Sequence, residues 1–150
     1  NDSKKLTKKQ RERLSTEILE SALSTSISFI EPQEIDRINI HKAALFAMAE
    51  AIESLKIKPD FLLIDGFSLP STGLPQKAVI KGDESVVSIA AASIIAKVER
   101  DRIMTDYNKI FPGYGFDRNV GYGTAEHLNA LQKLGATQIH RKSFKGVTSQ

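Results

Sequence analysis

The stretch IKGDESVVSIAAASIIAKVERD, residues 80–101, contains the features that decide the fold. A Gly-Asp turn precedes a segment from Ser85 to Ala96 that is apolar at almost every position, and dense charge follows. A helix that is apolar nearly all round is buried. We therefore expect a buried helix from about Ser85 to Ile110, whose alanines and serines allow it to lie close against a sheet.

A strand is predicted upstream of this helix, at Phe61-Leu-Leu-Ile64. Apolar residues at consecutive positions are typical of a strand that is covered on both faces, as in the interior of an α/β sheet. A second short strand is predicted at Lys77–Ile80. Because strands alternate with helices, the sequence predicts an α/β domain with at least partly parallel pairing.

Further elements are predicted on both sides of these strands. Thr7 and Gln10 have the spacing of a capping box, which begins a helix from about Lys8 to Leu23. A β-branched and aromatic segment, Ser26–Ile30, predicts another strand. The remaining predicted elements are a helix that Pro32 opens and Lys58-Pro59-Asp60 ends, and a helix with Thr124 as its N-cap and Gly135 just beyond its end.

The composition limits the class of protein. A chain of 150 residues that is 41% hydrophobic and 26% charged has the size of one globular domain, so we expect residues 1–150 to form a single domain. The absence of cysteine excludes disulfides, thiolate metal sites and a cysteine nucleophile. No apolar run approaches the roughly 18 residues of a transmembrane helix, and NDSKKLTKKQRER has no apolar signal core. We expect a cytoplasmic protein that does not bind membranes.

The basic residues are clustered, although the net charge is only +3. Clusters near the start, the middle and the end of the chain could converge on a polyanion such as nucleic acid. On charge alone, solvated helix faces and tails are the favoured interpretation. The clustered residues are Lys4, Lys5, Lys8, Lys9, Arg11 and Arg13, then Lys97, Arg100 and Arg102, and finally Arg141, Lys142 and Lys145.

Two aspartates are candidates for chemistry because each follows a predicted strand. Asp65 and Asp83 lie beside glycines, at strand ends where α/β sheets present ligand-binding groups. Adjacent carboxylates repel each other unless a cation neutralises them, and hard oxygen ligands select Mg²⁺ or Mn²⁺. The alternative is that both are ordinary turn residues. Asp101 lies roughly 25 Å from Asp83 along the helix, so we expect a structural or surface residue that shares no metal with Asp83.

Six motifs point to one family. In chain order they are DSKKL at 2–6, LLIDG at 62–66, KGD at 81–83, AAASIIAKVERD at 90–101, GYGTAEH at 121–127 and HRKSF at 140–144. Together they resemble type 2 ribonuclease H (ribonuclease HII) and cover essentially the whole chain. AAASIIAKVERD is highly specific, whereas IDG alone is a weak signal.

The resemblance implies a ribonuclease H-like mixed sheet flanked by helices, with a C-terminal helical region at about 105–150. In that family four acidic residues bind two divalent metal ions, and Asp65 and Asp83 match two of the four. The implied activity is metal-dependent hydrolysis of the RNA strand of RNA–DNA hybrids, and cleavage on the 5′ side of ribonucleotides embedded in duplex DNA. We expect a monomer with Mg²⁺ or Mn²⁺ as cofactor.

Three further residues match family positions that contact substrate. Tyr122 of the GYGT motif resembles the ring that packs on the sugar beside the RNA–DNA junction. Without the resemblance, a loop aromatic in the core is the favoured interpretation of Tyr122. Ser3 and Lys4 resemble residues on the substrate-strand side of the cleft, although Lys4 could equally be exposed to solvent. His127 and His140 follow family patterns and are expected to be structural or close to DNA.

The sequence departs from the family pattern in two places. The family begins with a GxDExGRG-like segment that supplies an Asp-Glu pair and a loop that reads the ribose 2′-OH, and no such segment occurs in the 150 residues. We expect an N-terminally incomplete catalytic domain, or alternatively a nucleic-acid-binding fragment or pseudoenzyme. The residues before GYGT are RNV, where Lys-His or Lys-Asn-Lys is more usual, so strand contacts by Arg118, Asn119 and Val120 are not carried over.

Overall fold

The computed structural model describes residues 6–147, which fall into two compact units. The strand unit comprises Asn1–Phe29 and Leu45–Val98, and the C-terminal unit comprises Ile30–Ala44 and Glu99–Gln150. Each unit has a hydrophobic cluster of its own. The expected single domain remains a prediction.

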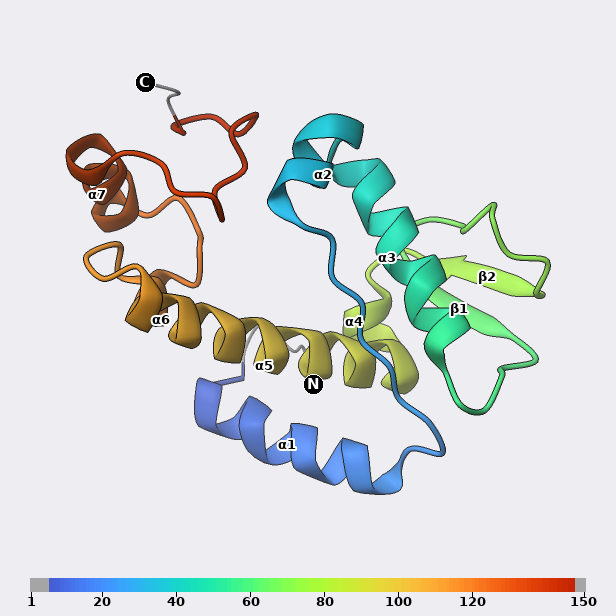
Figure 1. The fold of residues 1–150 in the computed structure, drawn as a ribbon. Coiled ribbons are helices and arrows are strands. Elements are labelled where there is room, and N and C mark those ends of the chain that lie inside the picture. Colours follow the sequence, from blue (N-terminus) through green and yellow to red (C-terminus); the bar gives the residue numbers. More distant parts are fainter. Residues whose placement is uncertain (1–5, 148–150) are drawn as a thin grey trace. The chain divides into compact units, whose positions relative to one another are not determined.

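The described residues form seven helices and two strands (Figure 1). In chain order these are α1 (Lys8–Ser21), α2 (Pro32–Ile38), α3 (Ile40–Ser54), β1 (Leu62–Asp65), β2 (Gln76–Val79), α4 (Gly82–Ser85), α5 (Val87–Ile110), α6 (Phe116–Asn119) and α7 (Ala125–Leu134). The predicted capping box of α1 is confirmed, since the Thr7 amide donates to Gln10 Oε1 over 2.8 Å and the Gln10 amide donates to Thr7 Oγ1 over 3.3 Å.

The two strands form a parallel sheet in the strand unit. β1 pairs with β2 so that Leu62 lies opposite Gln76 and Asp65 lies opposite Val79. The two predicted strands and their parallel pairing are confirmed to within one residue. Among residues 6–147 the sheet contains no third strand, so the mixed sheet expected from the family resemblance is seen here only as this parallel pair.

One face of the sheet packs against α3 (Figure 1). Leu62, Ile64 and Leu69 are buried in a cluster to which α3 contributes apolar side chains. Leu63 points to the other face and is 42% exposed. The expectation that both faces are covered is therefore wrong for the described part of the chain, because burial alternates along β1 as it does in a sheet with one covered face.

The segment predicted as a strand at Ser26–Ile30 is extended but pairs with no strand, so that prediction is wrong. Two of its serines instead form hydrogen bonds with residues of α3. The Ser26 hydroxyl donates to the carbonyl of Ala51, and the Ser28 hydroxyl donates to the Glu50 carboxylate. Side-chain hydrogen bonds of this kind compete with a backbone ladder.

The helix predicted from Pro32 onward is two helices, because Asn39 interrupts it. Asn39 has φ 71°, a region that L-residues rarely adopt. Its Oδ1 accepts a hydrogen bond from the Lys42 amide over 3.1 Å, which caps the start of α3. Asparagine favours caps and turns over helix interiors, and the apolar periodicity on its own does not reveal the break.

The helix predicted from about Ser85 to Ile110 is confirmed as α5, which begins two residues later, but it is not buried all round. α4 ends where the Val86 amide donates to Gly82 O over 2.8 Å, and α5 begins at the next residue. On α5, Ile94 and Ile95 are buried, whereas Ala92 and Ala96 are exposed. The helix therefore has a covered and an open face.

No helix within residues 6–147 is long and apolar enough to cross a membrane.

The C-terminal unit is built around aromatic side chains. Tyr114 and Phe116 stack with their ring centres 5.3 Å apart and pack with Ala130 and Leu131 of α7. The predicted N-cap of α7 is confirmed, since Thr124 Oγ1 accepts from the amide three residues on. Beyond α7 the described residues form turns, so the expected helical region ends earlier than predicted.

α2 is fastened to one of these C-terminal turns by a carboxylate. Asp36 accepts hydrogen bonds from the amides of Lys142 and Ser143, over 2.8 and 2.9 Å. Hydrogen bonds from the hydroxyl and amide of Ser143 hold the pKa of Asp36 below its usual value, because they stabilise the ionised form. The contact joins two segments of the C-terminal unit that lie far apart in the sequence.

Candidate metal and nucleic-acid site

Asp65 is the last residue of β1, at the carboxyl end of the sheet. Its side chain is exposed, and its Oδ1 accepts a hydrogen bond from the amide of Gly82 over 2.8 Å. A carboxylate has further lone pairs available for a cation. The same bond joins the end of β1 to the residue that precedes Asp83.

The turn before Asp83 has a defined geometry. Lys81 has φ 53° and ψ 42°, a left-handed conformation that is costly for residues with a Cβ. A Cβ added to Gly82 would lie 2.5 Å from Cδ1 of Ile89 and 3.4 Å from Cβ of Val79. The backbone of Gly82 therefore passes close to both β2 and α5, which fixes the path of the chain into Asp83.

Asp83 lies in the first turn of α4 and is 6% exposed. A buried carboxylate needs hydrogen bonds or a cation to offset the loss of water. Asp65 and Asp83 both belong to the strand unit and are linked through Gly82. Their role as metal ligands remains a prediction; no cluster of three or more His, Asp or Glu side chains suited to a metal is found within residues 6–147. Asp101 is also buried, which favours the structural interpretation of this residue over the surface one.

Tyr122 belongs to the C-terminal unit, in the loop between α6 and α7. Since 59% of Tyr122 is exposed, the interpretation as a core aromatic is wrong. The guanidinium of Arg100 lies 4.7 Å from the centre of the Tyr122 ring, within the range of a cation–π contact. Arg100 Nη2 also donates to the carbonyl of Val120 over 3.0 Å. Arg100 of α5 thus contacts both the ring and the backbone of this loop.

Two of the three residues before the GYGT motif, Arg118 and Asn119, stabilise the loop through side-chain contacts. Arg118 forms an ion pair with Glu126 and lowers the pKa of that carboxyl through a hydrogen bond. Asn119 is buried; its Nδ2 donates to the Tyr114 carbonyl over 2.7 Å, and its Oδ1 accepts from the Gly121 amide over 2.9 Å. The unusual RNV segment therefore stabilises the loop itself, and this role does not depend on any contact with substrate.

Arg141 adds a second guanidinium to this part of the C-terminal unit. Burial lowers the pKa of Arg141, and the positive charge of Arg100 lowers it further, against the opposing effects of Asp36 and Tyr122. Two partly desolvated cations that repel each other would be stabilised by an anion such as phosphate. Arg100 and Arg141 were noted in the sequence only as members of basic clusters.

Two buried histidines connect the Tyr122 loop with the C-terminal turns. His127 and His140 are 4% and 7% exposed, and their Nε2 atoms are 3.2 Å apart. His127 Nδ1 lies 2.9 Å from the carbonyl oxygen of Tyr122. Burial lowers the pKa of His140, and charge on His127 lowers it further. Both residues stand in the GYGTAEH and HRKSF motifs, but no feature of the sequence predicts that they touch each other.

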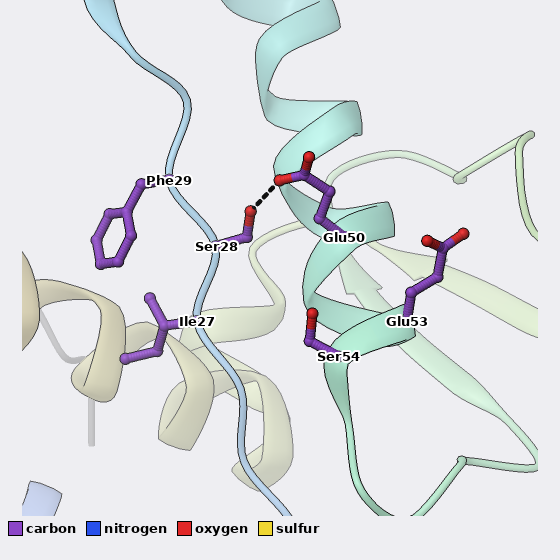
Figure 2. Close-up of a pocket in the computed structure, with 6 residues that line it drawn as sticks. All are labelled: Ile27, Ser28, Phe29, Glu50, Glu53 and Ser54. Carbon is purple, nitrogen blue, oxygen red and sulfur yellow. Dashed lines mark hydrogen bonds between the residues drawn. The ribbon is translucent and has the colours of Figure 1, made fainter.

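The other predicted substrate residues, Ser3 and Lys4, lie outside the described residues, so their roles remain predictions. A surface pocket does occur in the strand unit, between the extended segment before α2 and the helix α3 (Figure 2). The residues that line it are Ile27, Ser28, Phe29, Glu50, Glu53 and Ser54. None of the predicted site residues lines this pocket, so it is separate from the candidate site.

Comparison with known proteins gives relatives that are described as Ribonuclease HII. A protein described as Ribonuclease HII from Desulfitobacterium hafniense (strain Y51) is 52% identical over 150 residues, which are 100% of this chain and 58% of that protein. The Ribonuclease HII of Lactobacillus acidophilus is 53% identical over 148 residues, 99% of this chain and 59% of that protein. The chain therefore spans less than two thirds of the length of these relatives.

The fold also matches a solved structure. The crystal structure of the ribonuclease H2 from Pyrococcus horikoshii OT3 aligns with a TM-score of 0.82 over 97% of this chain and 77% of that chain. At 24% sequence identity this likeness shows a shared fold alone. The family model described as Ribonuclease HII matches residues 1–147. That match takes in all six motifs, and with it the resemblance seen in the sequence is confirmed: this chain belongs to the ribonuclease HII family.

Proposed function

We propose that this chain carries the activity of a metal-dependent endoribonuclease, which hydrolyses the RNA strand of RNA–DNA hybrids and cuts 5′ of ribonucleotides embedded in duplex DNA. The observation that supports this most strongly is the family match over residues 1–147, which includes both strand-end aspartates. The hydrogen bond from Gly82 to Asp65 adds to it, because it links the two aspartate motifs at one edge of the sheet.

Asp65 and Asp83 would hold the divalent metal. Their donor atoms are hard carboxylate oxygens, which suit Mg²⁺ or Mn²⁺. Mg²⁺ keeps several water ligands and is commonly bound through one or two carboxylates together with substrate phosphate oxygens, so two aspartates fit such an ion. When bound, the metal would supply electrostatic stabilisation of the negative charge that develops at the phosphate. The buried position of Asp83 and the bond that fixes Asp65 would keep the two ligands in place.

The C-terminal unit would contact the duplex. The exposed ring of Tyr122 offers a flat apolar face for a sugar, and Arg100 holds that ring from one side. The neighbouring charges of Arg100 and Arg141 would favour a phosphate of the nucleic-acid backbone. RNA–DNA hybrids, and duplex DNA with embedded ribonucleotides, are therefore the proposed substrates.

A cleavage assay tests this function. A DNA duplex with one embedded ribonucleotide is incubated with the chain and Mg²⁺ or Mn²⁺, and product is measured by gel electrophoresis. We expect cleavage 5′ of the ribonucleotide that stops when EDTA is added. Asp65→Asn and Asp83→Asn should each lower the rate about a hundredfold or more, since a bound metal contributes several kcal/mol to catalysis. Asp60→Asn, at an exposed position before β1, is the matched control and should cleave normally.

A second candidate function stands beside the first. Asp65 and Asp83 match two of the four acidic residues of the family. The alternative is a protein that binds the same duplexes without cutting them. Tight binding with no product, unchanged by metal, would establish this alternative and contradict the proposed nuclease activity of the chain.

The family also supports expectations about the architecture and state of the protein. We infer a mixed sheet with more strands than the two described, a monomer, and a location in the cytoplasm. Light scattering on the purified chain tests whether it is a monomer. A stable dimer at micromolar concentration would contradict the expected monomer.

A further inference from the structure

We propose that His127 and His140 form a neutral hydrogen-bonded relay that positions the Tyr122 loop for the duplex. The inference rests on the proposed function, because it assigns Tyr122 a contact with substrate. It gives the two histidines a role as positioning residues. Neither of them contacts substrate in this proposal.

The hydrogen bonds fix the tautomer of both rings. The Thr137 amide can only donate, and it lies 3.0 Å from His140 Nδ1, so His140 Nδ1 accepts and the ring proton is on Nε2. The Tyr122 carbonyl can only accept, and it lies 2.9 Å from His127 Nδ1, so His127 Nδ1 carries a proton. The neutral His127 therefore has a lone pair on Nε2, which accepts from His140 Nε2–H across 3.2 Å.

The hydrogen bonds run in one direction, from His140 to His127 and then to the Tyr122 carbonyl. Each ring nitrogen of the pair takes part in a hydrogen bond, so no ring nitrogen is left to accept another proton. A proton added to His127 Nε2 would face the N–H of His140, and a proton added to His140 Nδ1 would face the amide of Thr137. The rings around the pair are those of Tyr114 and Phe116, whose centres lie 5.2 Å from His140 and 5.3 Å from His127. Burial raises the pKa of Tyr114, so this neighbour supplies no negative charge that would favour a charged imidazole.

Charged side chains flank the pair along the chain but are engaged elsewhere. Glu126 precedes His127 and is paired with Arg118. Arg141 follows His140, and its guanidinium lies 3.7 Å from the centre of the Phe144 ring. The surroundings therefore favour the neutral form of His140, whose pKa is lowered by burial.

The relay ends on the backbone of the residue that carries the exposed ring. The Tyr122 carbonyl accepts from the Thr124 amide over 2.8 Å as well as from His127. The Tyr122 amide donates to the Asn119 carbonyl over 2.8 Å. The peptide groups on both sides of Tyr122 are thus held, while the ring stays available to a ligand. Loss of the His127 bond would leave the Tyr122 carbonyl with one donor and allow the loop to shift.

A metal bound between the two Nε2 atoms is the competing interpretation. Such a metal requires lone pairs on both Nε2 atoms, but the Thr137 amide places the His140 proton on Nε2. The described residues also contain no group of three or more His, Asp or Glu side chains suited to a metal. The geometry therefore favours a hydrogen bond between the two rings.

The first test reads the relay directly and needs no activity. Imidazole ¹⁵N–¹H spectra of the whole chain at neutral pH should show the proton of His127 on Nδ1 and that of His140 on Nε2. Metal analysis of the same sample should find no zinc. The opposite tautomer on either ring, a charged His140, or one equivalent of retained zinc would overturn the proposal.

Two variants of His127 separate the bond to Tyr122 from the bond to His140. Asn carries an N–H as many bonds from Cα as Nδ1, so His127→Asn keeps a donor for the Tyr122 carbonyl. Gln places its polar group as far out as Nε2, so His127→Gln keeps the partner of His140 and loses the Tyr122 bond. In NMR spectra, His127→Gln should shift the Tyr122 and Gly123 amides more than His127→Asn does. Equal shifts contradict the relay even if the chain proves not to bind nucleic acid.

Duplex affinity, measured in EDTA by fluorescence anisotropy, tests the effect on binding. We expect His127→Gln to weaken binding about three- to tenfold, the cost of leaving one contact group mobile, and His127→Asn to bind nearly as well as the unchanged chain. In a Tyr122→Ala background the effect of His127→Gln should disappear, because coupled residues are not additive. If the losses of duplex affinity in the two variants are additive, the histidine pair is merely structural and does not act through Tyr122. His41→Gln, at an exposed position of α3, is the control and should bind normally.

Discussion

At the scale of single residues, the backbone conformation of Val120 shapes the loop that carries Tyr122. Val120 has φ 43° and ψ 35°, a left-handed conformation that is unusual for a β-branched side chain. The conformation directs the Val120 carbonyl to Arg100, which donates to it through two nitrogens. The motif that follows could be identified from the sequence, but the strain before it could not, because valine on its own predicts extended structure.

Replacing Val120 should relieve this strain. Asparagine tolerates the left-handed region, so Val120→Asn should raise the free energy of unfolding by about 1 kcal/mol, the usual cost of that region for an L-residue. Urea denaturation followed by circular dichroism measures the change. Val87→Asn, at an exposed position of α5, is the matched control and should change stability by no more than about 0.5 kcal/mol. A Val120→Asn protein that is less stable than the original would show that Val120 is not strained.

At the scale of elements, the sequence predicted what local chemistry decides. The capping residues Thr7 and Thr124 begin helices where expected, and both short strands form in the expected parallel pair. The strand at Ser26–Ile30 was wrong because β-propensity does not reveal that serines will bond to α3. The continuous helix after Pro32 was wrong because an apolar stripe persists across Asn39, where the backbone turns.

The break at Asn39 can be tested by comparing two substitutions. Asn39→Ala removes the cap on α3 and leaves a Cβ in an unfavourable conformation, so unfolding should become easier by about 1–2 kcal/mol. Asn39→Gly also loses the cap but suits a positive φ, so its cost should be only a few tenths of a kcal/mol. Urea denaturation gives both values. If alanine and glycine destabilise the protein equally, the positive φ of Asn39 has no energetic cost.

At the scale of the whole molecule, the sequence predicted candidate residues in each of the two units separately. Asp65 and Asp83 were identified as a pair because strand ends bring polar residues to one edge, and the strand unit links them through Gly82. Tyr122 was identified only through the family motif, since spacing gives a lone loop tyrosine no role. The contact between His127 and His140 depends on tertiary packing in the C-terminal unit, which no local pattern encodes.

Buried His140 also gives the molecule a pH-dependent stability. The pKa of His140 is lowered in the folded protein from its usual 6.5, first by burial and then by charge on His127. The unfolded chain therefore binds a proton more readily, and stability should be complete above about pH 6.5 and fall as the pH drops through the lower pKa of the folded state. Carboxyls with lowered pKa values, such as those of Glu34 and Glu99, lose their contributions only below 4.5, in a separate range.

Urea denaturation at a series of pH values between about 7.5 and about 5 isolates the contribution of His140, because this range lies above the titration of the carboxyls. In the unchanged protein we expect the free energy of unfolding to stay level from about pH 7.5 to about pH 6.5 and to fall as the pH drops further. In His140→Gln the decline should be flatter, since the side chain that takes up the proton is gone. His41→Gln, at an exposed position, should keep the original slope. Parallel curves for His140→Gln and the unchanged protein would mean that another group controls stability in this range.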